Sequence, residues 1–174
     1  DARVPVPNQY FGAFQDGTLK YRGIELRRRD TTLWVRKIQL KALEILSQAD
    51  SPQEFSEYVP DVIRFVDYAR QELRAGRIPL GELIIRQRLS RAIEAYKTPS
   101  LAARAARQLQ AYGRQFAPGQ SVQFLFTRGG DGVLAWDLDG ALEPGRLDAK
   151  RYCTILDRAM RTVLDPYKLH PTPK

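Results

Sequence analysis

Two short stretches of the sequence combine basic side chains with hydroxyl and aromatic groups. The first holds Lys20, Tyr21, Arg22, Arg27, Arg28 and Arg29, and the second holds Arg86, Arg88, Ser90, Arg91, Tyr96 and Lys97. Such mixtures suit a phosphodiester backbone, because cations supply affinity and hydroxyl donors fix the register of the contact. For any single arginine, an ion pair or a solvated position explains the residue equally well. The clustering of these residues therefore indicates a polyanionic partner. No single residue is enough to indicate one.

The overall composition agrees with this chemistry. The chain has 174 residues, 28 Lys and Arg against 20 Asp and Glu, and a formal net charge of +8. Most of the basic residues are arginines, whose planar fork suits phosphates, although a GC-rich genome gives the same bias. A basic surface without any nucleic-acid partner stays open as an alternative. Since no apolar run approaches the roughly 18 residues needed to cross a bilayer, no membrane partner is expected.

Residues that could support catalysis are few. Asp137 and Asp139 lie two apart, on one face of a predicted strand, as Mg²⁺ ligands of two-metal enzymes often do. A solvated strand end is the favoured interpretation, because no third carboxylate converges on them. His170 is the only histidine and has no acid-base partner, and Cys153 faces the apolar side of a helix as a packed thiol. No hydrolytic triad can be assembled.

The ends and the single cysteine set expectations about processing and compartment. Cys153 alone forms no internal disulfide and no cysteine-based zinc site within this chain, so a reducing, intracellular compartment is expected. The sequence opens at Asp1 without a charged segment followed by an apolar one. We therefore expect a processed chain or a piece of a longer one.

The first basic stretch lies where a predicted hairpin meets a predicted helix. Aromatic and apolar residues on both sides of Asp16-Gly17 predict antiparallel strands over 9–14 and 19–28, because Asp-Gly accepts the positive φ angles of a tight turn. Asp30 is a suitable N-cap for a helix over about 31–47. The apolar residues of that helix recur at helical spacing: Val35, Ile38, Ala42 and Ile45.

A second helix is predicted directly after the first. Ser51 as cap, Pro52 at the first position and Glu54 three residues after the cap form its start signal, and Gly76 ends it. Pro60 is expected to kink or break this helix near its start. The expected buried stripe is Phe55, Tyr58, Val62, Val66, Ala69 and Leu73.

The second basic stretch lies between a predicted strand in "ELIIRQRL" and a loop or short helical turn in "SRAIEAYK". Thr98 and Pro99 open an alanine-rich helix that runs to Tyr112. Two strands around the turn "TRGGDG" follow, and Asp148 caps a last helix. The predicted fold class is α+β: an antiparallel hairpin that leads into a mostly helical lobe with a small β-sheet.

The order of these motifs resembles one family. "QYFGAFQDGTLKYRGIELRRRD" resembles the end of the palm of a family B DNA polymerase, where a strand pair leads through "RGxExxRRD" into the first helix of the thumb. "LIIRQRLSRAIEAYK" and "AARAARQLQAYGRQFAPGQSVQFLF" are similar to successive thumb elements, and "DAKRYCTILDRAM" resembles the closing thumb helix. Each motif alone is a weak indication of the family. Four of them in this order, over about residues 9–164, are a specific one.

The resemblance implies a palm edge over 1–30, a thumb over 31–166 and a loose tail over 167–174. It implies that the chain holds primer-template duplex DNA, with Tyr10 near the newly made base pair and Arg28 and Arg29 on the primer backbone. Gln9 stands where the family usually has lysine, and its amide could donate an uncharged hydrogen bond to base edges. Four thumb residues would contact the duplex: Ser90, Arg91, Tyr96 and Lys97.

The resemblance also implies what this chain leaves to others. The metal-binding aspartates and the exonuclease of the family belong upstream of Asp1, so the chain is expected to bind no cofactor, and Mg²⁺ is expected in the upstream palm. Its expected partners are duplex DNA and the upstream exonuclease, palm and fingers polypeptide of the same polymerase, in the cytoplasm at the nucleoid. Two other hypotheses stay open: a duplex-binding module whose parent has lost catalysis, and an arginine-rich scaffold for an acidic protein.

Overall fold

The chain falls into two units. The structure, a computed structural model, describes residues 32–136, 138, 142–143 and 145–164 in full and the backbone of residues 2–3, 10–13 and 19–22. The first unit comprises Asp1–Arg77 and Cys153–Lys174, and the second comprises Ile78–Tyr152. Both units contain helices and an antiparallel sheet, so the predicted α+β class is confirmed. Within the described residues no helix is both long enough and apolar enough to cross a membrane.

Three short strands form the sheet of the first unit, in the order β1-β2-β3. They are β1 (Ala2–Arg3), β2 (Tyr10–Ala13) and β3 (Leu19–Arg22), and both neighbouring pairs are antiparallel. The predicted hairpin is confirmed over β2 and β3, whereas β1 was not predicted. The predicted turn at Asp16-Gly17 and the predicted strand beyond Arg22 lie outside the described residues.

Helix α1 (Leu33–Leu46) is capped by Thr32, so the prediction of Asp30 as its cap was wrong. The Thr32 hydroxyl accepts a hydrogen bond from the Val35 N–H at 3.2 Å, and its extended backbone is that of an N-cap. Asp and Thr are both good caps, and the pattern alone did not separate two candidates this close together. Ile45, predicted to be buried, is half-buried. The buried side chains of α1 are Trp34, Val35, Ile38, Gln39, Ala42, Leu43 and Leu46.

Helix α2 (Pro52–Arg74) starts at the predicted cap. The Ser51 hydroxyl accepts a hydrogen bond from the Glu54 N–H at 3.1 Å, and Pro52 loses no helical hydrogen bond at the first position. The Glu54 carboxylate accepts a hydrogen bond from the Asp50 N–H at 2.9 Å, one residue before the N–H that a capping box uses. Glu54 therefore binds a backbone N–H at the helix start as predicted, but the N–H belongs to Asp50 and not to Ser51.

Pro60 does not break α2, which continues through this residue to Arg74, so the predicted break was wrong. The predicted kink stays a prediction. A proline in a helix interior costs about 3 kcal/mol, and the continuous buried face of this helix offsets that cost. The helix ends at Arg74, and Gly76 (φ +73°) follows two residues later, near its predicted end. The Gly76 N–H donates to the Leu73 carbonyl and the Arg77 N–H to the Glu72 carbonyl, both at 3.0 Å. The buried residues are Phe55, Val59, Val62, Val66, Ala69 and Leu73, with Val59 in place of the predicted Tyr58.

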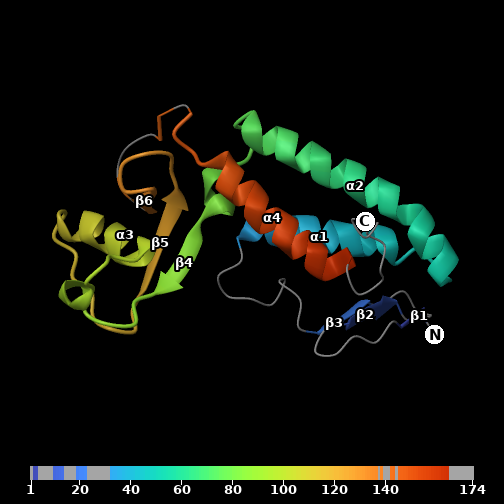
Figure 1. Ribbon diagram of the computed structural model, residues 1–174, viewed down its shortest axis with the longest axis horizontal. Helices are drawn as coiled ribbons and strands as arrows, with labels where there is room; N and C mark the ends of the chain where they lie inside the picture. The colour runs from blue at the N-terminus through green and yellow to red at the C-terminus, as the bar shows by residue number, and fades with distance from the viewer. Residues whose placement is uncertain are drawn as a thin grey trace. The chain divides into compact units, whose positions relative to one another are not determined.

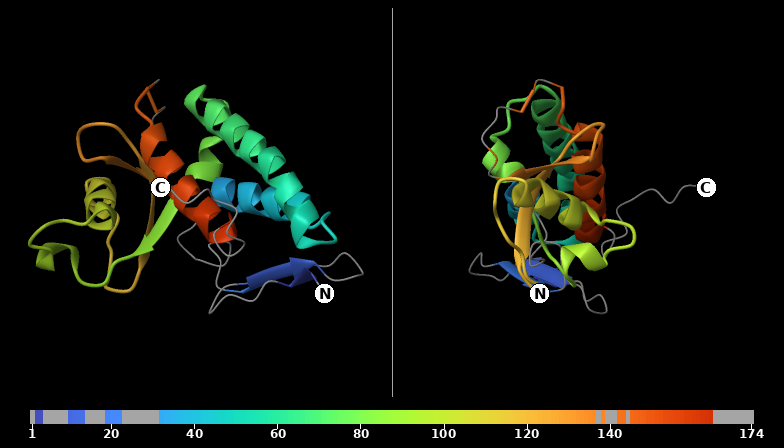
Figure 2. Two further views of the ribbon diagram at one scale, coloured as in Figure 1. Left: turned by 45° about the vertical axis from the view of Figure 1, so that its right-hand side comes forward. Right: turned by 90° about the vertical axis from the view of Figure 1, so that its left-hand side faces the viewer.

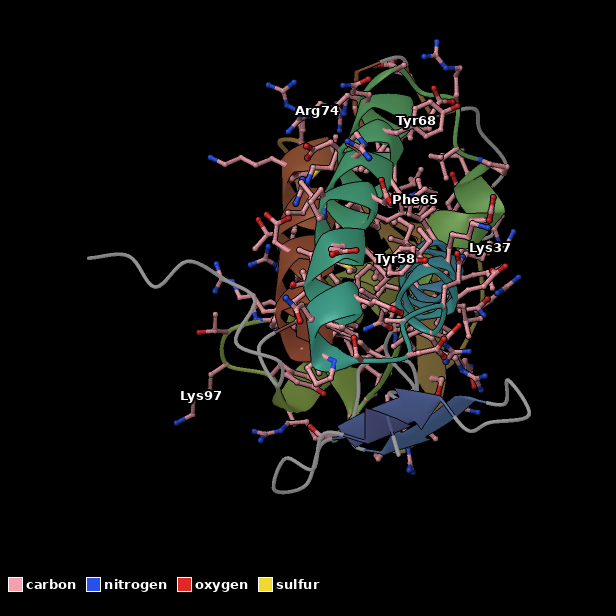
Figure 3. All side chains as sticks on the ribbon, turned by 90° about the vertical axis from the view of Figure 1, so that its right-hand side faces the viewer. Lys37, Tyr58, Phe65, Tyr68, Arg74 and Lys97 are labelled. Carbon is pink, nitrogen blue, oxygen red and sulfur yellow. The ribbon has the colours of Figure 1, made fainter. Side chains whose placement is uncertain are left out.

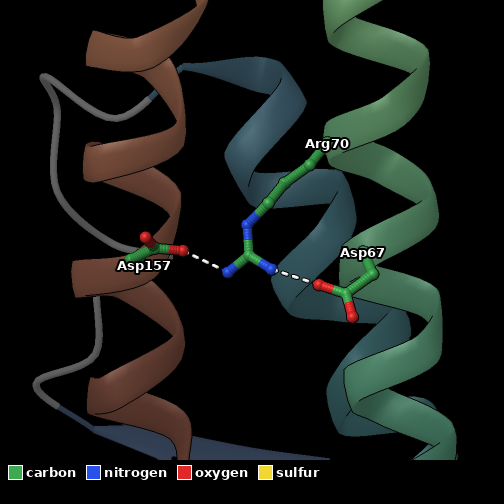
Figure 4. A network of polar contacts seen from close by, with 3 residues as sticks. All are labelled: Asp67, Arg70 and Asp157. Carbon is green, nitrogen blue, oxygen red and sulfur yellow. Dashed lines mark hydrogen bonds and ion pairs between the residues drawn. The ribbon is translucent and has the colours of Figure 1, made fainter.

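Helices α1, α2 and most of α4 (Ala149–Leu164) make up the core of the first unit, and Figure 2 shows them from two sides. Tyr58 and Phe65 lie on the side of α2 that faces α1 (Figure 3). Arg70 of α2 lies between Asp67 on its own helix and Asp157 on α4, with ion pairs to both (Figure 4). Burial alone would lower the pKa of Arg70, but the hydrogen bond and charge of Asp157 outweigh it and raise the pKa.

The second unit is built on an antiparallel sheet in the order β4-β5-β6 (Figure 1). Its strands are β4 (Ile85–Arg88), β5 (Ser121–Phe126) and β6 (Val133–Trp136). The strand predicted in "ELIIRQRL" is confirmed but shorter, because Leu80–Leu83 forms a 3₁₀ turn. The two strands predicted around the glycine-rich turn are confirmed.

Helix α3 (Leu101–Gln110) packs against β5 and β6 and is capped by Ser100. The Ser100 hydroxyl accepts a hydrogen bond from the Ala103 N–H at 3.1 Å, so the predicted start at Thr98 and Pro99 was two residues early. The helix also ends before the predicted Tyr112.

Gln108 of α3 binds the outer edge of β6. Its amide nitrogen donates to the Val133 carbonyl at 2.9 Å, and its amide oxygen accepts from the Ala135 N–H at 2.8 Å. These two backbone groups belong to alternate residues of the edge strand. The side chain therefore takes the place that the peptide groups of a fourth strand would occupy.

Tyr152, near the start of α4, connects two other segments of the second unit through hydrogen bonds of its buried hydroxyl. The predicted Asp148 cap is confirmed, since its carboxylate accepts from the Arg151 N–H at 3.1 Å. The fully buried Tyr152 hydroxyl accepts from the Phe126 N–H at 3.1 Å and donates to the Leu83 carbonyl at 2.7 Å. Burial raises the pKa of this phenol well above its ordinary value.

Candidate nucleic-acid interface

The structure brings two predicted site residues of the first unit together. The backbones of Tyr10 in β2 and Arg22 in β3 are directly opposite in the antiparallel register. The other predicted residues of this region, Gln9, Arg27, Arg28 and Arg29, lie outside the described residues.

Strand β4 presents two of the predicted arginines on one face. Ile85 is buried, whereas Arg86 and Arg88 are exposed, as the alternation of side chains along a strand requires. Leu89 is buried beyond the strand. The apolar residues thus hold β4 in the core and direct both guanidinium groups outward.

Two residues of β5 extend this face and were missed by the sequence reasoning. Arg86 is opposite Gln123, and Arg88 is opposite Ser121, in the antiparallel register of β4 and β5. Gln123 is exposed and Ser121 half-buried. Their amide and hydroxyl groups add uncharged donors beside the two cations. The alternation in "SVQFLF" contained the signal, but only the register shows which arginine each residue faces.

The loop after β4 is closed by a tyrosine. The Tyr96 hydroxyl accepts a hydrogen bond from the Ser90 N–H at 3.1 Å and lies 3.2 Å from the Ser90 hydroxyl. Ile93, in a 3₁₀ turn (Ile93–Ala95), is buried beneath the loop. Arg91 lies over the Tyr96 ring, with its guanidinium carbon 5.4 Å from the ring centroid. The short helical turn predicted in "SRAIEAYK" is confirmed.

Tyr96 and Lys97 present different groups to solvent. The hydrogen bond with the Ser90 side chain, together with the Ser90 N–H and the charge of Arg91, lowers the pKa of Tyr96. Lys97 is exposed, and its side chain extends into solvent (Figure 3). The predicted cluster of residues 90–97 is therefore one preformed loop with cations on its surface.

Three cations of this face have no carboxylate partner within the described residues. Among the residues that the structure describes, no Asp or Glu oxygen lies within 4 Å of the side-chain nitrogens of Arg86, Arg88 or Arg91. The Arg88 Nε instead donates to the Gly119 carbonyl at 3.1 Å. A face with cations, hydroxyls and amides can bind an anion through charge and directed hydrogen bonds.

The described residues offer little for catalysis. No group of three His, Cys, Asp or Glu side chains among them is placed to hold a metal ion. Cys153 is buried, which confirms the packed thiol, and burial raises the pKa of that thiol. Asp137, Asp139 and His170 lie outside the described residues.

Known proteins resemble this chain over nearly its whole length. The model of DNA polymerase family B matches residues 8–161. DNA polymerase 1 of Saccharolobus solfataricus is 28% identical over 157 residues, which cover 89% of this chain and 17% of that protein. The DNA polymerase of Thermococcus aggregans is 28% identical over 115 residues, which cover 66% of this chain and 6% of that protein.

A solved structure shares the fold. The family B DNA polymerase from the hyperthermophilic archaeon Pyrobaculum calidifontis matches with a TM-score of 0.74 and 20% identity, over 98% of this chain and 21% of that one. The chain thus spans only a small part of the length of each of these proteins. Because the family model covers most of the sequence, the chain belongs to DNA polymerase family B.

Proposed function

We propose that this chain is the palm-edge and thumb segment of a DNA-directed DNA polymerase, which grips the primer-template duplex and positions the primer end. The observation that carries the proposal is the face of Arg86, Arg88 and Arg91 with Ser90, Ser121 and Gln123. On this face, cations that pair with no described carboxylate stand beside uncharged donors. In a chain of this family, a phosphodiester backbone is the anion that such a face fits best.

The palm edge and the thumb contact different parts of the DNA in this proposal. Residues 1–30 form the palm edge, where Tyr10 approaches the newly made base pair, Gln9 donates to a base edge, and Arg28 and Arg29 hold the primer backbone. Residues 31–166 form the thumb, which holds the duplex through the loop of Ser90, Arg91, Tyr96 and Lys97. The pairing of Tyr10 with Arg22 supports this division, since it sets a base-contacting and a cationic residue side by side.

Nucleotide addition is assigned to another segment of the same polymerase. We place Mg²⁺ in an upstream palm together with the catalytic aspartates, as membership of this family suggests. In this proposal the chain supplies binding and orientation, and the upstream exonuclease, palm and fingers polypeptide is its partner at the nucleoid. By holding the primer terminus in line with the incoming nucleotide, the chain raises the rate of nucleotide addition through proximity.

Duplex binding as a function of salt tests the proposal. The affinity of the chain for a fluorescent primer-template duplex, followed by anisotropy, should fall linearly on a log-log plot with a slope that corresponds to roughly three to six phosphate contacts. A flat response to salt would contradict a role in holding DNA. An acidic protein that competes with the duplex at equal charge would favour the scaffold hypothesis.

Two further measurements separate the palm edge from the thumb. Replacing Arg28 and Arg29 with Ala should weaken binding equally for all duplex sequences, because these side chains would contact phosphate and not bases. Primer extension by a mixture of this chain and an upstream polymerase polypeptide should exceed that of the polypeptide alone. An equal rate with and without the chain would favour a binding module whose parent has lost catalysis.

A further inference from the structure

A depression in the second unit lies next to β4, and apart from Arg86 its lining residues were not singled out by the sequence. It has a volume of about 410 Å³ and is lined by Arg86, Arg114, Gln115, Phe116, Gln120 and Ser121. All but Arg86 belong to the segment between α3 and β5 or to the first residue of β5. Arg86 connects the depression to the candidate interface.

The segment that forms the depression is fixed to the end of β4. The Leu89 N–H donates to the Gln120 carbonyl at 2.9 Å, and the Gly119 N–H donates to the Leu89 carbonyl at 2.7 Å. The Arg88 guanidinium binds the Gly119 carbonyl from the side. Gly119 has φ +87°, and a Cβ there would lie 3.3 Å from an Arg88 nitrogen, so only glycine fits without strain. The walls are therefore held in place before any ligand binds.

Each polar side chain that lines the depression can donate a hydrogen bond. The Gln120 amide oxygen accepts from the Ala117 N–H at 2.8 Å, which leaves the amide NH₂ as the group available to a ligand. Arg86 and Arg114 add two guanidinium groups, and within the described part of the chain no carboxylate lies within 4 Å of either. None of the six lining residues is acidic. The chemistry is that of an anion site.

We propose that this depression binds one backbone phosphate of the nucleic acid, held by Arg86, Arg114 and the Gln120 amide, with Phe116 against the adjoining sugar. The proposal rests on the duplex-binding function above and extends it to residues 114–121. An oxygen-rich anion satisfies the converging donors through charge-assisted hydrogen bonds. The apolar ring of Phe116 adds a surface that a free inorganic anion would not use, which favours a phosphodiester over a small ion.

The variant Gln120→Glu tests the site with the smallest change in shape. The glutamate keeps an oxygen for the Ala117 N–H but replaces the outward NH₂ with a negative oxygen. We expect duplex affinity to fall about tenfold, as for the loss of one hydrogen bond to a charged group. The control Gln71→Glu adds the same charge on an exposed position of α2 and should change affinity less than twofold.

The variant Arg114→Gln measures the charge directly. The log-log salt slope should fall by about 0.9, the contribution of one phosphate contact. Arg64→Gln, which removes an arginine already paired with Asp61 in the first unit, should leave the slope unchanged. If wild type shows no salt-dependent duplex binding, the proposed function fails. If wild type binds but Arg114→Gln and Gln120→Glu match their controls, this inference alone is overturned.

Amide NMR of the full chain distinguishes the sources of the anion. Duplex DNA should shift the side-chain and backbone amides of Gln115 and Gln120 at concentrations that saturate the anisotropy signal. Inorganic phosphate at the same phosphate concentration should shift them by less than a tenth as much. Equal shifts with inorganic phosphate would identify a small-anion site and overturn the assignment to a nucleic-acid backbone, as would a duplex titration that leaves both residues unmoved.

Discussion

The two units use arginine in different ways. In the first unit, Arg64 pairs with Asp61, Arg77 with Glu72, and Arg70 with both Asp67 and Asp157. In the second unit, Arg88 donates to a backbone carbonyl and Arg91 lies over an aromatic ring. The paired guanidinium groups are neutralised inside the unit, whereas Arg88 and Arg91 have no carboxylate within 4 Å in the described part of the chain. A count of basic residues does not separate the two uses.

Local composition explains the contrast. Helix α2 carries five acidic and three basic side chains, so each arginine has a carboxylate within one or two turns. Residues 78–128 carry eight basic and two acidic side chains, so few partners are near. The excess charge of the second unit is concentrated before Asp131. Electrostatic attraction of DNA should accordingly depend on the second unit more than on the helices of the first.

The largest effect should come from removing three cations of the second unit. The triple variant Arg86→Ala, Arg91→Ala, Lys97→Ala should lose about a thousandfold in duplex affinity at low salt, at about tenfold for each charge-assisted contact. The salt slope should fall by about three. The matched triple of ion-paired residues, Lys41→Ala, Arg64→Ala and Arg77→Ala, should bind almost as wild type. Similar losses in both triples would show that the two units do not differ in this respect.

A second prediction concerns stability and leaves charge untouched. Tyr152→Phe should lower the free energy of unfolding by about 3 kcal/mol, because it strands the Phe126 N–H and the Leu83 carbonyl in the core. Urea denaturation followed by circular dichroism measures the change. Tyr112→Phe is the control, since Tyr112 is 72% exposed and its replacement should have almost no effect.

The raised pKa of Tyr152 predicts the sign of a pH effect. Burial disfavours the phenolate, so the folded state holds this proton more tightly than the unfolded state. The stabilisation is complete below the ordinary tyrosine pKa of about 10 and is lost progressively as the pH rises above it. Wild type should therefore lose more stability than Tyr152→Phe between about pH 10 and 11, and an equal loss would contradict the assignment.

A smaller effect is expected from the ion pairs of the first unit. Arg70→Met should cost about 1 kcal/mol in urea, because the partly exposed pairs with Asp67 and Asp157 are weakened by solvent screening. The salt slope of duplex binding should stay at the wild-type value. A change in slope without a change in stability would mean that Arg70 contacts DNA and is not reserved for internal pairing.

The smallest effect should appear in the titration of one phenol. In Ser90→Ala the hydrogen bond from the Ser90 side chain to Tyr96 is lost, so the pKa of Tyr96 should rise toward its ordinary value. The ring-carbon NMR signal of Tyr96 reports this midpoint, and that of the exposed Tyr112 serves as the internal reference. If the midpoint of Tyr96 does not move, the loop is not closed through this contact.

Local signals in the sequence predicted most of the elements. The Ser51 cap and the strands around "TRGGDG" were predictable because the residues that decide them lie within a few positions of one another. The caps of α1 and α3 were misplaced because each helix start offers two capping residues close together. Val59 took the place of Tyr58 in the buried stripe of α2, and Tyr58 is half-buried beside it.

Contacts between distant residues were out of reach. Tyr152 binds groups 26 and 69 positions away, and nothing near it in the sequence indicates a buried hydroxyl with two partners. Ser121 and Gln123 joined the candidate interface only once the register set them opposite Arg88 and Arg86. Arg114 was passed over because it follows Gly113 in a loop, where an isolated arginine carries no pattern. The sequence thus showed which segments carry the basic residues. The register of β4 and β5 and the loop before β5 showed which residues lie beside them.

Gln108 has a consequence for how this unit meets other chains. An exposed edge strand with open N–H and C=O groups invites pairing with a strand from another molecule. Because the amide of Gln108 already occupies the Val133 carbonyl and the Ala135 N–H, a strand from a neighbour can pair there only after displacing this side chain. One side chain therefore terminates the sheet at three strands and protects this edge against strand-to-strand aggregation.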